Sequence, residues 1–262
     1  MSLKSALYEL FEQHGEQFST KTVLMLAEQF LDRIEYLHER GYIHRDIKPE
    51  NFLMGLGESK DTVYLADFGL AEKNDEVYNE KAGFAGTLKY ASINTHFGIS
   101  QSRRDDMESI GYVLMEFQIG SLPWDKRNPK TKKRLNTWEI GVMKKQTSVE
   151  NICKGCYKEF HMYLHYCRGL RFDEKPDYDY LERLFKGLFY RLGYKKTIYA
   201  DKMCISNHVS VYEPFEQDQL NFLSNSSRFT KNIQGERLTN VDLYYQPLPN
   251  PTIASVNLMF SF

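Results

Sequence analysis

The chain has 262 residues, of which 42% are hydrophobic and 26% charged, so it can build a folded core and is not a disordered or low-complexity protein. Its 34 lysines and arginines nearly cancel its 35 aspartates and glutamates, which excludes a global positive field of the kind that attracts nucleic acid or a membrane surface. The purest apolar run of the first half, residues 23–27, is far shorter than the ~20 residues of a membrane span.

The cysteines and the first residues indicate an intracellular compartment. The 4 cysteines are too few for a disulfide scaffold at this length, so we expect reduced thiols. The first six residues carry no apolar signal region and have serine where myristoylation needs glycine. We therefore expect the cytosol or the nucleus, with neither a membrane nor a nucleic acid as partner.

Local patterns predict a helix, a loop and a hairpin in the first third of the chain. Apolar residues recur every three or four positions after Ser19, which predicts a long helix over residues 19–40 that ends before Gly41. Pro49 forbids helix in the segment that follows, which we expect to be a structured loop. Residues 52–54 and 63–66 have the pattern of two short strands joined by a turn.

The remainder divides into a helical part and a tail. Periodic apolar residues predict helices near 104–119, 134–145, 157–167 and 177–190, so the fold is α+β and mainly α. After residue 200 the composition shifts to proline, serine and asparagine. We expect one domain over residues 1–195 and an irregular tail over residues 196–262.

Two motifs carry chemistry. The catalytic-loop pattern of protein kinases is matched at residues 44–51 by His-Arg-Asp-Ile-Lys-Pro-Glu-Asn, and Asp-Phe-Gly follows at residues 67–69. Phosphoryl transfer requires a carboxylate that takes the proton of a hydroxyl, as Asp46 could, and oxygen ligands for Mg²⁺, as Asn51 and Asp67 could supply. Lys48 could neutralise charge on the transferred group. The alternative is that these are ordinary surface charges.

Further segments resemble the casein kinase I family of serine/threonine kinases. They are residues 51–55, 86–96, 102–106, 120–124 and 166–172, and the resemblance covers residues 3–193. It implies a protein kinase C-terminal lobe with a short β-hairpin at the catalytic loop. Ser-Ile-Asn at residues 92–94 stands where most protein kinases have Ala-Pro-Glu, so Asn94 cannot form an ion pair with Arg168. We expect Arg168 to be a helix-end charge or to contact the backbone.

The resemblance implies a role for each site residue. Asp46 is the catalytic base, Asn51 and Asp67 hold the metal, Thr87 bridges Asp46 and Lys48, and Asp106 braces the loop. The ATP-binding set comprises Lys48, Glu50, Asn51, Leu53, Ala66 and Asp67. For the apolar members, Leu53 and Ala66, core packing is the alternative.

The segment after Asp-Phe-Gly lacks a serine or threonine as far as Gly86 and has only Tyr78 as a phosphorylatable side chain. Arg45, the arginine before the catalytic aspartate, must therefore find another anion. Asp75, Glu76 and Glu80 are candidates, or packing orders the segment instead. We do not expect a phosphorylation switch there.

A basic cluster at residues 126–134 places six positive charges in nine residues. One interpretation is a site for acidic or already phosphorylated substrates, which the resemblance favours and which would include Lys89, Lys133 and Arg134. A solvated loop and a nuclear import signal are the other two. The family's usual arginine before Tyr90 is a lysine here, and the usual glycine after Trp124 is missing.

Two other groups have weak patterns. Cys153 and Cys156 lack partners at zinc-ligand spacing, so we expect ordinary thiols. His161 and His165 lie four residues apart without an acidic motif partner, and we expect surface histidines.

Three parts of a complete kinase have no match in these residues: the glycine-rich phosphate lid, the strand lysine and the helix glutamate that holds it. Residues 2–12 resemble the first helix of the C-terminal lobe, so we expect that about eighty residues of the family template precede it. We predict a serine/threonine kinase of casein kinase I type that uses ATP and Mg²⁺ and is nearly inactive as this chain. The alternative is a kinase-derived module that binds acidic or phosphorylated partners without catalysis.

Overall fold

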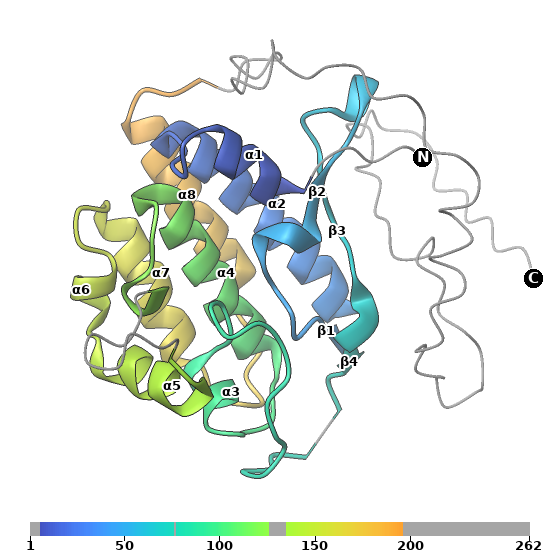
Figure 1. Ribbon diagram of the computed structural model, residues 1–262. Coiled ribbons are helices and arrows are strands. Elements are labelled where there is room, and N and C mark those ends of the chain that lie inside the picture. Colours follow the sequence, from blue (N-terminus) through green and yellow to red (C-terminus); the bar gives the residue numbers. More distant parts are fainter. Residues whose placement is uncertain (1–5, 76, 126–134, 196–262) are drawn as a thin grey trace, which may run out of the picture.

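The computed structural model describes residues 6–75, 77–125 and 135–195 (Figure 1). The predicted tail and the basic cluster, with Lys133 and Arg134, lie outside these ranges. The helices are α1 (Leu7–Gln13), α2 (Thr20–Glu39), α3 (Ile93–His96), α4 (Arg103–Ile119), α5 (Thr137–Gln146), α6 (Val149–Ile152), α7 (Lys158–Gly169) and α8 (Tyr178–Arg191). The strands are β1 (Tyr42–Ile43), β2 (Phe52–Met54), β3 (Val63–Leu65) and β4 (Glu72–Lys73). The described part is thus α+β and mainly helical, as expected.

The long helix predicted near the start is α2. Ser19 caps it, because its hydroxyl accepts a hydrogen bond from the Thr22 amide at 3.2 Å. The apolar residues that defined the period are buried: Val23, Ala27, Phe30, Ile34 and Leu37. After the helix ends, Gly41 takes a left-handed conformation with φ of 75°, which suits a glycine.

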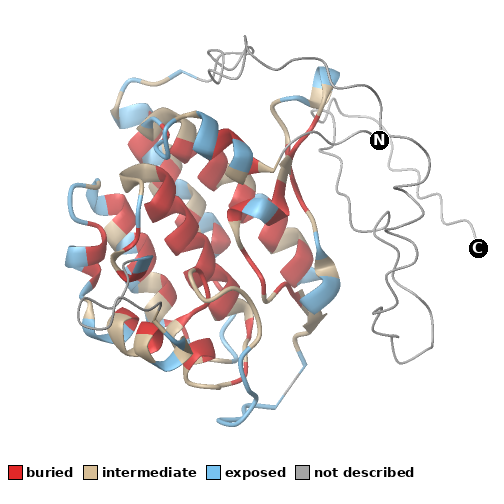
Figure 2. Ribbon diagram, viewed as in Figure 1, coloured by how far each residue is buried: buried red, intermediate tan, exposed pale blue. Residues whose placement is uncertain are grey.

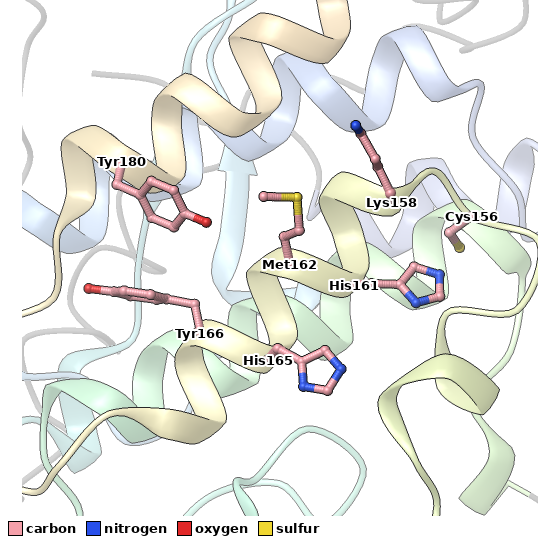
Figure 3. A pocket seen from close by; sticks show the side chains of 7 residues that line it. All are labelled: Cys156, Lys158, His161, Met162, His165, Tyr166 and Tyr180. Carbon is pink, nitrogen blue, oxygen red and sulfur yellow. The ribbon is translucent and has the colours of Figure 1, made fainter.

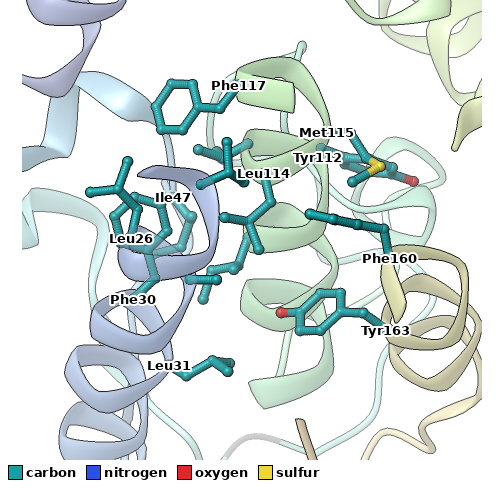
Figure 4. Packing of buried hydrophobic residues seen from close by; sticks show 14 of the residues in the cluster. Leu26, Phe30, Leu31, Ile47, Tyr112, Leu114, Met115, Phe117, Phe160 and Tyr163 are labelled. Atoms are coloured by element: carbon teal, nitrogen blue, oxygen red, sulfur yellow. The ribbon is translucent and has the colours of Figure 1, made fainter. Parts of the chain in front are cut away.

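Helix α4 forms the centre of the core. Every residue from Asp105 to Phe117 is buried, and α4 packs against α2 and α7 (Figures 2 and 4). A Cβ at Gly111 would lie 3.1 Å from side-chain atoms of both Tyr163 and Leu164. Glycine therefore lets α4 and α7 approach closely, and α4 is buried on all sides rather than along one stripe.

Two small antiparallel ladders flank the helices. In β2–β3, Phe52 pairs with Leu65 and Met54 with Val63, which confirms the predicted hairpin. Phe52 stacks on Phe30 of α2 with ring centroids 3.8 Å apart, so the hairpin is fixed to the core. The β1–β4 ladder was not predicted, because each strand has two residues and the partners, Tyr42 with Lys73 and Ile43 with Glu72, lie far apart in the sequence.

The later helices were predicted with different accuracy. Helices α4, α7 and α8 agree with the expected ranges, whereas α5 begins at Thr137 rather than at residue 134. The cause is a capping box, in which Asn136 and Glu139 each accept a hydrogen bond from the other's amide. The four-residue helices α3 and α6 are too short to show a period. Within the described ranges, no helix has the length and apolar character needed to cross a membrane.

Candidate active site

Residues between β1 and β2 bring the predicted catalytic groups together. The two carboxylate oxygens of Asp46 are each held by a donor: Lys48 Nζ lies 2.6 Å from Oδ2, and the Thr87 hydroxyl lies 2.7 Å from Oδ1. Asn51 Nδ2 donates to the Asp46 carbonyl at 2.8 Å, so the loop folds back on itself. Asp46 is 8% exposed, which leaves an edge of a buried carboxylate open to an incoming group.

Asp67 is placed beside this loop by the β2–β3 ladder. The Ala66 amide donates to the Asn51 carbonyl at 2.9 Å, which brings the predicted metal ligands Asn51 and Asp67 to the same end of the hairpin. Asp67 has a left-handed backbone with φ of 59°, uncommon for a residue with a Cβ. Its carboxylate accepts a hydrogen bond from the Gly69 amide at 3.3 Å, and the rest of the side chain faces solvent.

The predicted nucleotide contacts occupy two environments. Along β2, Phe52 and Met54 are buried, whereas Leu53 between them is partly exposed, as expected where side chains alternate across a strand. Ala66 is likewise partly exposed, and Glu50 is exposed on the turn before β2. Leu53 and Ala66 therefore do not belong to the buried core cluster.

His44 connects the catalytic loop to Asp-Phe-Gly. The Asp46 amide donates to Nδ1 at 3.3 Å, so the ring proton lies on Nε2, which donates to the Ala66 carbonyl at 3.0 Å. Burial lowers the pKa of His44, against the opposing charges of Asp106, Asp46 and Asp67. The ring is therefore a neutral structural link.

Asp106, in the first turn of α4, braces the loop as the resemblance implies. Its two oxygens accept hydrogen bonds from successive amides, His44 at 2.7 Å and Arg45 at 2.9 Å. His38 of α2 lies 2.9 Å from the same carboxylate. Burial acts to raise the pKa of Asp106, but the His38 contact and the His44 amide outweigh it and lower the pKa. The carboxylate is thus stabilised in its charged form.

The anion that Arg45 finds is Glu72. Arg45 forms an ion pair with this residue of β4, and its Nε donates to the Leu70 carbonyl at 2.7 Å. Glu72 was not among the predicted partners Asp75, Glu76 and Glu80, and of these Glu76 lies outside the described residues. The sequence prediction missed Glu72 because the pair depends on the β1–β4 ladder, in which Ile43 lies opposite Glu72.

Lys89, predicted to bind a substrate anion, contacts two carboxylates of its own chain. It forms an ion pair with Glu116 of α4, and its Nζ lies 3.0 Å from an Asp125 oxygen. The Tyr90 hydroxyl donates to Glu116 at 2.6 Å. Burial acts to lower the pKa of Lys89, but the two carboxylates outweigh burial and raise the pKa above its ordinary value. Lys89 therefore stays positively charged at neutral pH.

Arg168 on α7 contacts the backbone, as expected, and also a carboxylate that was not foreseen. Its Nη1 lies 3.4 Å from the Thr147 carbonyl, and its Nε lies 3.6 Å from Glu108 Oε1 on α4. The same Glu108 oxygen accepts a hydrogen bond from the Ile93 amide at 3.2 Å. Glu108 therefore links Arg168 to residues 92–94, although Asn94 carries no charge.

The histidine candidates lie elsewhere, around an open hollow of about 750 Å³ on α7 (Figure 3). His161 and His165 line it with Cys156, and His165 contacts the Glu150 carboxylate at 2.8 Å. Burial raises the pKa of Cys153 to about 12 and that of Cys156 to about 11, so both thiols are protonated at neutral pH. Within the described ranges, no three histidine, cysteine or acidic side chains gather as a metal site.

The comparison with protein families agrees with this geometry. The model of the protein kinase domain matches residues 2–173, which include the catalytic loop, Asp-Phe-Gly, the Lys89 segment and α4. The matched region covers more than half of the chain. The chain belongs to the protein kinase family.

Proposed function

We propose that this protein is a serine/threonine kinase of casein kinase I type, with residues 1–195 forming its C-terminal lobe. It transfers the γ-phosphate of ATP to serine or threonine side chains of proteins. The observation that carries the proposal is that Lys48 and Thr87 each donate a hydrogen bond to one of the two carboxylate oxygens of Asp46. By the resemblance, a lysine at the position of Lys48, two residues after the catalytic-loop aspartate, is a feature of serine/threonine kinases. We place the protein in the cytosol or nucleus, where the free thiols of Cys153, Cys156 and Cys167 would stay reduced.

The donor set fits Mg²⁺ and a nucleotide. Mg²⁺ prefers oxygen ligands, and the exposed Asp67 carboxylate is one. Asn51 uses its amide nitrogen on the Asp46 carbonyl, so its Oδ1 is the atom suited to a cation. Leu53 and Ala66, partly exposed beside these groups, suit the face of an adenine. When bound, Mg²⁺ neutralises charge on the ATP phosphates.

The chemistry of the chain's own residues follows from the bonds of Asp46. Lys48 and Thr87 fix the carboxylate, so that it orients a substrate hydroxyl and accepts its proton as the oxygen attacks phosphorus. The Lys48 ammonium stabilises negative charge on the transferred phosphoryl group. Positioning and charge together supply most of the catalysis in this reaction class.

We further propose that substrates carry acidic or phosphorylated residues near the target hydroxyl, held by Lys89 together with Lys133 and Arg134. Lys89 pairs with Glu116 and Asp125, so in this proposal a substrate anion binds its ammonium by displacing one of these carboxylates. We also propose that this 262-residue chain transfers phosphate poorly when alone, because it contains no match to the phosphate lid or the strand lysine.

Phosphate transfer to serine peptides with acidic, phosphorylated or neutral flanks would test the proposal, measured with Mg²⁺ and labelled ATP. Two proteins are compared: the chain itself, and a chimera with the amino-terminal lobe of a casein kinase I placed before Ala6. We expect transfer by the chimera that falls about 10²- to 10⁴-fold in its Asp46→Asn variant. Thermal unfolding of both chimeras controls for folding.

The result that would overturn the enzyme proposal is a folded, ATP-binding chimera with the same background rate as its Asp46→Asn variant. If that protein still bound acidic peptides, the non-catalytic binding module would be the better description. Equal transfer to acidic and neutral peptides would overturn only the substrate preference.

A further inference from the structure

A lysine lies fully buried beneath the segment that carries Thr87 and Lys89. Lys144, near the end of α5, is 0% exposed, although lysines are almost never fully buried without partners. Its Nζ donates to three backbone carbonyls of this segment: Leu88 at 3.1 Å, Lys89 at 3.0 Å and Ala91 at 2.6 Å. No step proposed above uses this residue.

The three carbonyls identify the charge of Lys144. Each carbonyl oxygen accepts a hydrogen bond, and only the ammonium form of lysine has three N–H groups to donate, since the neutral amine has two. The faces of Tyr112 and Trp124 lie 4.7 Å and 4.9 Å from Nζ, where they favour a cation. Burial lowers the pKa of Lys144 and the charge of Arg168 adds to this, whereas Glu108 and Asp125 oppose it.

The three carbonyls belong to the turn that sets the position of Thr87. The amides of Tyr90 and Ala91 both donate to the Thr87 carbonyl, at 3.0 Å and 2.9 Å. The Thr87 side chain in turn donates to Asp46. A shift of this turn would therefore move the Thr87 hydroxyl relative to Asp46, and it would also move Lys89.

We propose that Lys144 is a positioning residue for substrate binding: its buried ammonium gathers the carbonyls of residues 88, 89 and 91 and thereby sets the shape of the segment that faces the substrate. The effect on substrates depends on the kinase function proposed above. The ordering of the segment does not depend on it, and it can be measured separately.

Hydrogen exchange of the full-length chain tests the ordering. Lys144→Met keeps an unbranched side chain that is one atom shorter and removes all three donors, whereas Lys145→Met changes the neighbouring, exposed lysine of the same helix. We expect the Tyr90 and Ala91 amides to exchange about tenfold faster or more in Lys144→Met, because charged hydrogen bonds are lost. Amides at the centre of α4 should be unchanged, and Lys145→Met should match the wild type. Unchanged exchange at residues 90 and 91 would overturn the proposal.

A second variant separates positioning from simple destabilisation. Lys144→Ala leaves space for a small amine, and propylammonium should restore slow exchange at residues 90 and 91. Tetramethylammonium, which has the charge but no N–H donor, should not. Equal effects of the two ions would contradict the proposed role. If Lys144→Met does not fold, the Lys144→Ala series decides the question at a temperature below its unfolding transition.

Binding of an acidic peptide by the same variants, measured by fluorescence anisotropy, tests the effect on the substrate. We expect about a tenfold weaker affinity in Lys144→Met and no change in Lys145→Met. If the wild-type chain bound no peptide, the proposed substrate preference would fail while the exchange data still decided the ordering. A wild-type-like affinity in Lys144→Met would limit Lys144 to a structural role and overturn the proposal.

Discussion

Arg45 of the catalytic loop forms an ion pair with Glu72 of β4, at the point where β1 and β4 lie side by side. The pair joins the arginine before the catalytic aspartate to the segment after Asp-Phe-Gly through a carboxylate that is always present. This bond therefore requires no phosphorylation. It agrees with the lack of serine and threonine between residues 70 and 85.

We expect Glu72→Gln to loosen this segment without unfolding the core. The Asn74 amide, which donates to the Gly41 carbonyl at 2.8 Å, should exchange faster. The loss should be about 0.2 to 1 kcal/mol of local opening free energy, because both side chains are partly exposed. Glu80→Gln removes the same charge from the same segment and should have no effect on Asn74. Slow exchange at Asn74 in both variants would show that packing, not the ion pair, orders the segment.

A second prediction concerns the pH dependence of stability. Asp105 is buried and accepts hydrogen bonds from the Ser92 hydroxyl at 2.5 Å and the Ser102 amide at 2.8 Å. Burial outweighs these bonds and raises its pKa from 3.8 to about 6. The folded protein therefore holds the proton more tightly, so the contribution of Asp105 to stability falls as pH rises from about 4 to about 6.

Urea unfolding at a series of pH values measures this contribution. Asp105→Asn should be less stable overall, because the cap at Ser102 is weakened, and should lack the decline between those pH values. Ser92→Ala should shift the decline to higher pH, since the Ser92 hydroxyl stabilises the carboxylate form. A pH profile of Asp105→Asn that runs parallel to that of the wild type would contradict the assignment.

The close approach of α4 and α7 can be tested by replacing a glycine at the contact and a glycine away from it. Gly111→Ala should destabilise the protein by about 1 to 3 kcal/mol, because the added methyl group would lie 3.1 Å from Tyr163 and Leu164. Gly187→Ala on α8 meets no atom within 4 Å and should stabilise the protein by up to about 1 kcal/mol through helix propensity. Thermal or denaturant unfolding measures both, and a neutral Gly111→Ala would show that the helices can separate without cost.

The acidic surroundings of Lys89 lead to a prediction about affinity. Asp125→Asn removes one of the two carboxylates that hold Lys89, so the lysine becomes more available to a substrate anion. We expect binding of an acidic peptide to tighten roughly two- to fivefold, with a larger gain at low salt. A neutral peptide of the same length is the control, and equal tightening for both peptides would count against a charge effect.

Features set by neighbouring residues could be predicted from the sequence. Helix α2 follows from the spacing of Val23, Ala27 and Phe30 and from the cap at Ser19, and the β2–β3 hairpin follows from two short apolar runs. The catalytic loop was found as a motif, and the structure brings Asp46, Lys48 and Thr87 together.

Features that depend on contacts between residues far apart in the sequence could not be predicted. The Arg45–Glu72 pair needs the β1–β4 ladder, and the two carboxylates at Lys89 come from α4 and from the turn after it. Lys144 and Lys145 look alike in the sequence as two charges near a helix end. Only the tertiary packing of Tyr112 and Trp124 buries one of them and leaves the other exposed.

Helix α4 carries four buried carboxylates that reach different parts of the site: Asp105, Asp106, Glu108 and Glu116. They hold Ser92, the catalytic-loop amides, Arg168 with Ile93, and Lys89 with Tyr90. The catalytic loop and the segment with Lys89 and Tyr90 are thus both attached to the same helix. Because one rigid helix holds both attachments, the spacing between the Asp46 loop and the Lys89 segment is set by the positions of these carboxylates along α4.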